Sequence, residues 1–447
     1  MTSRLQERLE RRGGERPRGS EPGPAPEAPI PEGRSAVIEE LRRRMERIAA
    51  RTSFPARDET SPPLGSQGVP DLPSPNRGGV GGEVLPGDAV DTPFGPAHLR
   101  RVAYPAGHRH GREPIDGFRG AGPHLAALAR LPALAALVPE GAVFLDTETT
   151  GLAGGTGTLP FLVGVARFDA AGALVVEQLL CRDPSEERAQ LELLVERLRG
   201  ATHLVTFNGR AFDLPLVSTR FVMHRLASPA HGLPHLDLLH VARRVFGRRL
   251  DDRSLGSLER AVLGFERVGD IPGAEIPAAY GAWLRGGPAA PMIAILEHNA
   301  LDLVALAALG GLLARLYADP DAVEHAADHL GLAKAAFAFG HRDAGDRHLA
   351  GATAWGGGDD KATALHMAAA EAGRRRDFAR AEVLLLELVA IEPHDALAHL
   401  ALAKLYEHRL KDYDRAALHA ARAAEAEGED ASTRRLERLK RKGSRCE

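Results

Sequence analysis

Two acidic residues two positions apart, Asp146 and Glu148, lie at the end of an apolar run that begins at Gly141. The run GAVFLDTET has the composition of a β-strand, and side chains two positions apart on a strand point to the same face. Two like charges on one face raise each other's pKa unless a cation neutralises them. Magnesium prefers a few carboxylates together with phosphate oxygens of a substrate. The pair therefore indicates a metal site, although D-x-E also occurs at ordinary exposed strand ends.

Two further acids lie where the same site could use them. Asp213 follows the apolar run HLVTFNG (203–209) and begins a predicted helix, where a carboxylate can also act as a simple cap. Asp302 lies on the last long apolar helix, four residues after His298, so both side chains face the same way. Four acids and one imidazole are what two-metal hydrolysis of a phosphodiester needs, with the ions about 3.5–4 Å apart.

The hydrophobic pattern predicts the elements that must position these residues. Predicted strands cover 141–149, 160–169, 173–183 and 203–209, with a short one at 233–241. Predicted helices begin at 184 and cover 213–226 and 292–317. The order β-β-β-α-β-α-β-α predicts an α/β fold, a mixed sheet with helices on its faces, over residues 89–318.

After Asp319 the strand patterns stop and helical segments with an internal repeat follow. Basic–acidic pairs recur at spacings of 34 and 35 residues, namely Arg342-Asp343, Arg376-Asp377 and Lys411-Asp412. A helix–turn–helix period of 34 is typical of tetratricopeptide repeats. We predict such an array over 319–430, with an irregular helical bundle as the alternative. Residues 431–447 form a basic tail, interpreted either as a second nucleic-acid contact or as a disordered end.

Residues 1–88 differ in composition from the rest of the chain. Two segments rich in Pro, Gly, Arg and Glu, 13–35 and 53–88, are too poor in large apolar side chains to fold, and we predict disorder. Between them a short helix is predicted near 36–51, serving either to dock or as a transient helix.

Composition excludes several functional classes. The chain has 57 Lys+Arg and 60 Asp+Glu, so no overall positive field points to nucleic acid. All six lysines lie at or after Lys334, which excludes a Walker phosphate loop before that point. Two cysteines, Cys181 and Cys446, exclude a disulfide framework and favour a cytoplasmic location. The longest apolar run, Leu303–Ala314, has 12 residues, so we expect a buried helix and no membrane contact.

The motifs together resemble a known family. The chain is similar to the DEDD (DnaQ-like) 3′–5′ exonucleases of the ribonuclease H-like fold, and more closely to the YprB-like bacterial proteins, in which such a domain precedes tetratricopeptide repeats. The strings that carry the resemblance are FLDTETTGLAGG, TFNGRAFDLPL, LPHLDLLHVARR, DIPGAEIP and EHNALDLVAL.

The resemblance implies a role for each matching residue. It makes Asp146, Glu148, Asp213 and Asp302 ligands of two divalent cations, Mg²⁺ or Mn²⁺, and His298 the base that takes a proton from water. It also implies substrate contacts, with Thr149 and Leu152 touching the terminal nucleotide and Asn208 and Phe212 lining the groove. The superfamily uses H-x4-D or Y-x3-D, whereas this chain has H-x3-D.

Other clusters offer alternative sites. A separate metal could be held by His231, His235, Asp237 and His240, or by His108 with His110. Asp237 can equally be an exposed residue or a support for the main site. The arginine run Arg243, Arg244, Arg248, Arg249 and Arg253 could track phosphates or could be a solvated surface.

These observations predict a metal-dependent nuclease, a 3′–5′ exonuclease acting on single-stranded nucleic acid ends. The repeats would bind a protein partner or a longer substrate. Two alternatives stay open, a catalytically silent scaffold and a structure-selective endonuclease. DNA and RNA are both open as substrates.

Overall fold

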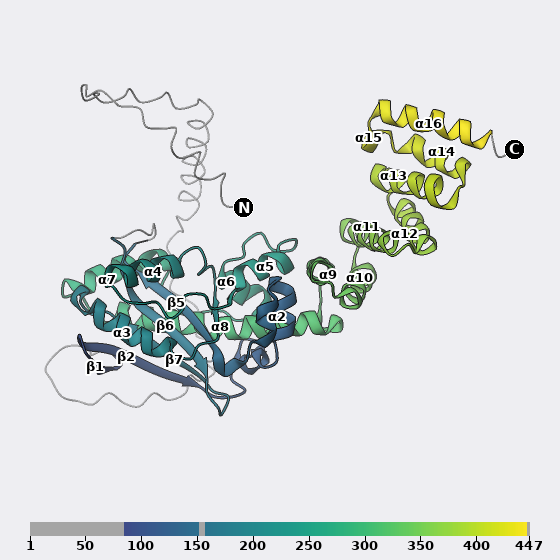
Figure 1. Cartoon of the computed structure of the whole chain (residues 1–447). Helices are drawn as coiled ribbons and strands as arrows, with labels where there is room; N and C mark the ends of the chain where they lie inside the picture. Colours follow the sequence, from purple (N-terminus) through teal and green to yellow (C-terminus); the bar gives the residue numbers. More distant parts are fainter. Residues whose placement is uncertain (1–84, 152–156, 445–447) are drawn as a thin grey trace, which may run out of the picture. The chain divides into compact units, whose positions relative to one another are not determined.

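Residues 85–151 and 157–444 are described in the structure, which is a computed structural model (Figure 1). They belong to one unit of the chain, Pro75–Glu447. The predicted disorder of the N-terminal segments, the helix predicted near 36–51, and residues Leu152 and Cys446 lie outside or almost wholly outside this range.

A seven-stranded mixed sheet forms the first part of the described chain. Its strands are β1 (Asp88–Thr92), β2 (Gly95–Tyr104), β5 (Ala142–Thr149), β6 (Pro160–Phe168), β7 (Leu174–Leu180), β8 (His203–Thr206) and β9 (His235–Asp237). They lie in the order β1-β2-β7-β6-β5-β8-β9, with β8 and β9 parallel to β5 and the other neighbours antiparallel. The predicted mixed sheet is confirmed. The strands β1 and β2, which extend its edge, were not predicted.

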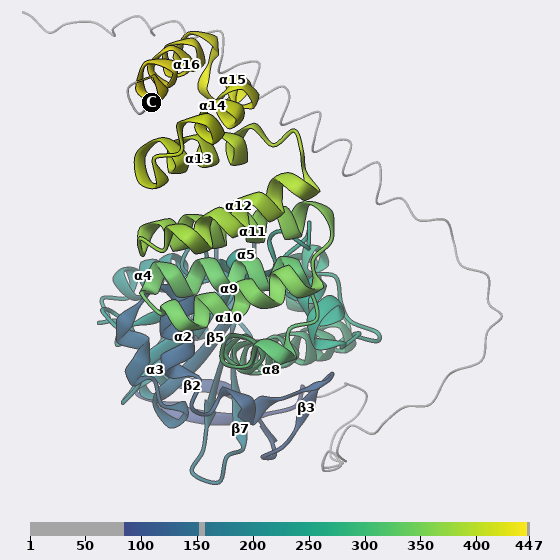
Figure 2. The same ribbon diagram turned by 90° about the vertical axis from the view of Figure 1, so that its right-hand side faces the viewer.

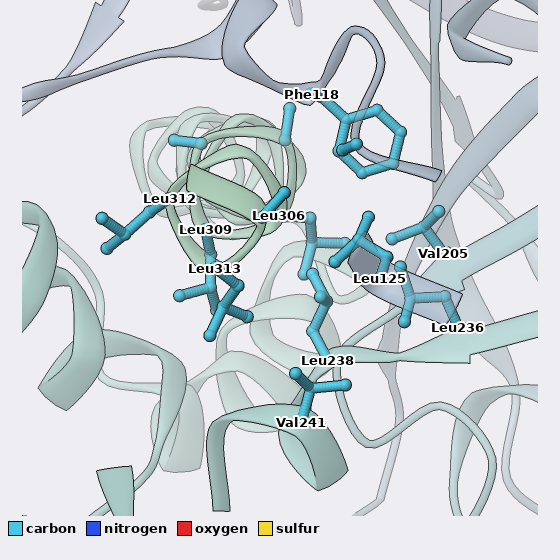
Figure 3. Close-up of a cluster of buried hydrophobic side chains, with 14 of the residues drawn as sticks. Phe118, Leu125, Val205, Leu236, Leu238, Val241, Leu306, Leu309, Leu312 and Leu313 are labelled. Atoms are coloured by element: carbon cyan, nitrogen blue, oxygen red, sulfur yellow. The ribbon is translucent and has the colours of Figure 1, made fainter. Parts of the chain in front are cut away.

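The two faces of β5 pack against different helices. Val143 and Leu145 are buried with residues of α3 (Glu187–Leu198) and α4 (Asp213–Met223). Phe144, which points the other way, is buried with residues of α8 (Ala290–Ala318). Figure 3 shows part of this second cluster, to which Leu306 and Leu309 of α8 belong together with Phe118, Val205 and Leu236. The sheet is therefore covered by helices on both faces, as predicted.

Helix α8 is the central helix of this layer. By length and composition it could cross a membrane, but 83% of its most apolar 18-residue window is buried inside the protein. Its apolar side chains pack on the sheet and on α2 (Gly122–Ala129). The predicted buried helix is confirmed.

One predicted strand is largely a helix. The segment 233–241 contains only a three-residue strand, β9, and α5 (Leu238–Phe246) begins immediately after it. The side chain of Asp237 accepts a hydrogen bond from the backbone N–H of Leu239 (3.2 Å) and caps the helix. Buried residues at Leu238, Val241 and Val245 follow helical spacing, which a short apolar run does not distinguish from a strand.

An all-helical array follows, as predicted. Its main helices are α9 (Ala326–Phe339), α10 (Arg342–Trp355), α11 (Gly358–Arg374), α12 (Phe378–Ile391), α13 (Ala396–Leu405), α14 (Tyr413–Arg422) and α16 (Glu429–Gly443), with short α15 (Ala424–Glu427) between the last two. Helices α9 and α10, α11 and α12, and α13 and α14 pack in pairs (Figure 2). The basic tail predicted at 431–447 lies mostly in α16, which packs on α14.

The recurring basic–acidic pairs mark the turn inside two helix pairs. Arg376 and Lys411 have φ of 63° and 60°, the left-handed conformation that ends a helix. The next residues, Asp377 and Asp412, each accept a hydrogen bond from a backbone N–H three residues on (3.0 Å in both). The sequence repeat is thus a repeated helix stop and start signal.

The sheet and the array share packing at their junction. Helix α9 lies against α5, and its residues Leu332, Ala335 and Ala336 belong to the same buried cluster as α8. Arg249 of the predicted basic run pairs with Asp328 of α9 (2.8 Å), and Arg248 pairs with Asp360 of α11 (2.5 Å). The boundary drawn at 318/319 from the sequence therefore lies within continuous packing, and two arginines of the run face the array.

Candidate active site

The end of β5 directs two carboxylates toward α8. Asp146 and Glu148 alternate with Thr147 and so share the face of Phe144, which packs on α8. Asp146 pairs across the sheet with Gly164 of β6. A Cβ at Gly164 would lie 2.2 Å from Oδ1 of Asn299 on α8, so only glycine allows this approach. Asn299 is fully buried, and its Nδ2 donates to Oδ2 of Asp146 (2.8 Å).

The third carboxylate is delivered by the loop after β8. Asp213 is the first residue of α4, and its Oδ1 accepts a hydrogen bond from Oγ1 of Thr147 (2.6 Å). The loop turns at Asn208, which has a left-handed φ of 63°. Buried Asp237 accepts hydrogen bonds from the backbone N–H of Asn208 (2.8 Å) and of Arg210 (3.2 Å). Asp237 thus shapes the loop that positions Asp213.

Helix α8 contributes the fourth carboxylate and the imidazole. Nε2 of His298 lies 3.5 Å from Oδ2 of Asp302 and 4.0 Å from Oε1 of Glu148. One ligand atom from each of these three residues falls within 4.8 Å of the others, the only such group of three or more among the described residues. Asp146 and Asp213 lie outside this group of three, but they interact with it through charge: Asp302 and Glu148 repel the charge of Asp146, and Asp213 repels that of Glu148.

Burial and mutual repulsion disfavour four ionised carboxylates here. Burial, followed by the charges of Asp302 and Glu148, raises the pKa of Asp146 well above its usual range. Burial likewise raises the pKa of Glu148 well above normal, and that of Asp213 to about 6. Burial also raises the pKa of Asp302, although Arg267 opposes the shift. Such a set binds protons or a cation, and its all-oxygen carboxylates fit Mg²⁺ or Mn²⁺.

A loop residue that was not predicted, Arg267, brings a positive charge to this site. Its guanidinium pairs with Asp302 on one side and with buried Glu259 on the other (2.8 Å). Asp270, from the same loop, accepts from Nδ1 of His298 (2.7 Å). The string DIPGAEIP begins at Asp270, but nothing in its spacing links that residue to His298, 28 positions later.

Three of the four residues expected to contact substrate lie on the strand and the loop that carry Glu148 and Asp213. Oγ1 of Thr149 donates to the backbone carbonyl of Gly151 (2.8 Å). Phe212, next to Asp213, exposes 58% of its surface, which is unusual for a large apolar side chain. Asn208 is half-buried in the loop described above. Leu152 lies outside the described residues.

The alternative histidine sites have other partners. Nε2 of His110 pairs with Glu259 (2.7 Å), and its ring stacks on Phe265. Nε2 of His235 pairs with Oγ1 of Thr206 (2.8 Å). Neither alternative cluster forms a metal-ligand group within the described part of the chain.

Comparison with known proteins agrees with this geometry. Residues 143–314 match the model of the RNase_H superfamily. An uncharacterized protein of Bacillus subtilis (strain 168), YprB, is 35% identical over 221 residues, which are 47% of this chain and 51% of that protein. The chain thus spans about half the length of this curated relative. The matched residues, 143–314, hold the four carboxylates and His298, so the part of the chain that is similar to the RNase_H superfamily is the part that contains the site.

Proposed function

We propose that this protein is a metal-dependent 3′–5′ exonuclease that removes nucleotides from single-stranded ends by a two-metal mechanism. The observation that carries the proposal is the convergence of four carboxylates, Asp146, Glu148, Asp213 and Asp302, from three elements. The superfamily match supports metal-dependent hydrolysis of nucleic acid at a coarser level.

Each side chain has a task in this proposal. The four carboxylates would hold two Mg²⁺ or Mn²⁺ ions, which acidify a water molecule and stabilise the leaving oxygen. His298 accepts the proton of the attacking water at Nε2, the atom that faces Glu148 and Asp302. Exposed Phe212 offers an aromatic surface on which the terminal base stacks. Asn208, in the loop before Asp213, and Thr149, at the end of β5, would contact the same nucleotide end.

The helical array has a separate role in the proposal. It resembles tetratricopeptide repeats in its sequence period, and we assign it the binding of a protein partner or of a longer substrate. A cytoplasmic location stays a prediction from the cysteine content.

Labelled oligonucleotides test the proposal directly. Single-stranded DNA and RNA with a 5′ label are incubated with Mg²⁺, Mn²⁺ or a chelator. We expect a ladder that shortens from the 3′ end, only with metal, and no cleavage of a circular strand. A phosphorothioate bond at the 3′ terminus should slow the reaction. Asp251→Asn, at an exposed acid outside the site, is the matched control for Asp146→Asn.

The other outcomes identify the alternatives. Cleavage of circles would identify an endonuclease on the same carboxylates. If all substrates stay intact with both metals, the fold is a catalytically silent scaffold. A shift of the labelled strand in a binding assay would then show whether that scaffold still holds nucleic acid.

A further inference from the structure

The loop that carries Arg267 and Asp270 is held at its start by contacts with residues near His110. Glu259 is buried at the start of the π-helix Glu259–Leu263, where it pairs with His110 and Arg267. The backbone N–H of Arg112 donates to the carbonyl of Leu263 (2.7 Å), and the next residue, Gly264, turns with a left-handed φ of 67°. The backbone just before Arg267 is therefore fixed in position relative to α8.

Arg267 pairs with one carboxylate oxygen of Asp302 and leaves the other oxygen free of that contact. Its guanidinium pairs with Oδ1, whereas Oδ2 lies on the side of His298 Nε2 (3.5 Å). The Arg267 side chain is only 10% exposed, and Nε is held by Glu259 at 2.8 Å. A planar guanidinium that is fixed at two points orients the carboxylate that it binds.

Asp270 fixes the imidazole in the same way. Nδ1 of His298 lies 2.7 Å from Oδ1 of Asp270 and 3.4 Å from Nη1 of Arg267; because an ionised carboxylate only accepts hydrogen bonds, the shorter contact places a proton on Nδ1. In a neutral ring, Nε2 is then the unprotonated nitrogen, and it faces Glu148 and Asp302. A second partner on the far nitrogen is the usual device that sets ring orientation and tautomer.

We propose that Arg267 and Asp270 are a positioning pair, which orients Asp302 and His298 on α8, and that Arg267 supplies the site with a built-in positive charge. This inference rests on the proposed function. Arg267 leaves Oδ2 of Asp302 facing Nε2 of His298 and offsets part of the charge of the four carboxylates. Asp270 directs Nε2 of His298 toward Asp302 and Glu148. Neither residue is a metal ligand or a proton acceptor in this arrangement.

Because Arg267 is positively charged, we predict that its removal changes metal affinity and kcat in opposite directions. Its removal leaves four carboxylates with less positive charge nearby, so attraction for a divalent cation rises, while the orientation of Asp302 is lost. We expect Arg267→Gln to bind Mn²⁺ about 3- to 10-fold more tightly, by calorimetry without nucleic acid. We expect its kcat to fall by about 10- to 100-fold with KM unchanged, as for other residues that orient a metal ligand. General damage to the site would weaken both properties.

Two further variants separate charge from orientation. Arg267→Lys keeps the charge but loses the fork between Glu259 and Asp302, so Mn²⁺ affinity should match the wild type while kcat still falls. Asp270→Asn should lower kcat about 10-fold with Mn²⁺ affinity unchanged. Arg285→Gln and Glu275→Gln, at exposed residues that do not line the cavity of His298 and Asp302, are the controls and should behave as the wild type. Arg267→Lys and Asp270→Asn keep the test valid if Arg267→Gln fails to fold.

The outcomes distinguish this inference from the proposed function. If the wild type binds Mn²⁺ and cleaves while both Arg267 variants and Asp270→Asn match the controls, the positioning pair is overturned and the nuclease stands. Weaker Mn²⁺ binding in Arg267→Gln also overturns it. If the wild type binds Mn²⁺ but cleaves nothing, the proposed function fails, and the calorimetry still decides the role of Arg267. A wild type that binds no Mn²⁺ overturns both.

Discussion

The sheet domain (residues 88–318) and the helical array (326–443) both bury acidic side chains, but they differ in how the charge is balanced. In the described ion pairs, one arginine, Arg267, reaches the four carboxylates of the sheet domain, through Asp302. In the array, fully buried Glu407 is surrounded by three cations, Arg435, Arg438 and Lys442.

The pKa shifts of the two regions have opposite signs for that reason. Burial raises the pKa of each site carboxylate, and neighbouring carboxylates add to the shift at Asp146 and Glu148. Hydrogen bonds from Arg438 and then Lys442 lower the pKa of Glu407 despite its burial. Glu407, whose charge is balanced by nearby cations, links the last helices of the array. The four site carboxylates have too little positive charge nearby, so they need a cation from outside the protein.

The strongest way to break this comparison is to remove one site carboxylate. Asp146→Asn, or Asp213→Asn, should lower hydrolysis by at least about 10³-fold, because metal ions supply several kcal/mol of transition-state stabilisation. The melting temperature without metal should be unchanged or raised, since repulsion is relieved. Steady-state assays and thermal unfolding in chelator measure the two effects. Retained activity in purified Asp146→Asn would exclude this site.

The second prediction concerns His298. His298→Ala should lower kcat by about 10²–10⁴-fold, the range for a lost general base. Mn²⁺ affinity should be nearly kept, because four carboxylates still hold the ions. His298→Tyr should restore part of the activity, because H-x3-D has the spacing of the tyrosine-bearing exonucleases. Loss of Mn²⁺ binding in calorimetry would make His298 a ligand, and an unchanged kcat would make it a residue of the helix surface.

Replacing a buried carboxylate by its amide should lower stability in the array, whereas in the site it should leave stability without metal unchanged or raised. Glu407→Gln leaves Arg435 without one of its two acidic partners, and we expect a loss of about 2–3 kcal/mol in the free energy of unfolding. Urea denaturation measures it, with exposed Glu425→Gln as the control. Hydrolysis of short oligonucleotides should not change. If Glu407→Gln is as stable as the control, the cations around Glu407 contribute no net stability.

The smallest predicted effect is a pH dependence of the site. A carboxyl whose pKa is raised by folding contributes stability at low pH that is lost as pH rises, for Asp213 between about 4 and 6. Without metal, Asp213→Asn should therefore gain on the wild type at pH 7, by about 2–4 °C in melting temperature, and this gain should shrink at pH 5.

The melting temperature of Asp213→Asn must be compared with that of the wild type at each pH, because buried histidines make the stability of the protein depend on pH in the opposite sense. Burial lowers the pKa of His235 and of His348 to about 4, so acid destabilises the whole protein through them. Their effect cancels in the difference between Asp213→Asn and the wild type. A difference that is the same at pH 5 and pH 7 would contradict the raised pKa of Asp213.

Regular elements with a strong period were predictable from the sequence. The runs at 141–149 and 160–169 became β5 and β6 almost unchanged, and the helix predicted at 292–317 became α8. Period 2 and period 3.6 are local properties, which few residues suffice to show. Where a run was short, as at 233–241, the period was ambiguous, and a helix was assigned to a strand.

The edge strands β1 and β2 show a different limit. Both strands carry many exposed side chains; β1 pairs with β2, and β2 pairs with β7, which lies about 75 residues later in the chain. Such a pairing depends on contacts between distant segments, which a local pattern does not contain.

For the site, sequence determined which residue types were present and which faces they shared. Asp146 with Glu148 and His298 with Asp302 were paired by the periods of a strand and a helix, and the structure brings the two pairs together. Arg267, Asp270 and Asn299 were decided only by tertiary structure, because their contacts join a loop, a helix and a strand that no local period relates. The physical reason is that a charge is compensated by whatever the fold places beside it, and only the packing of α8 on β5 and β6 determines that neighbour.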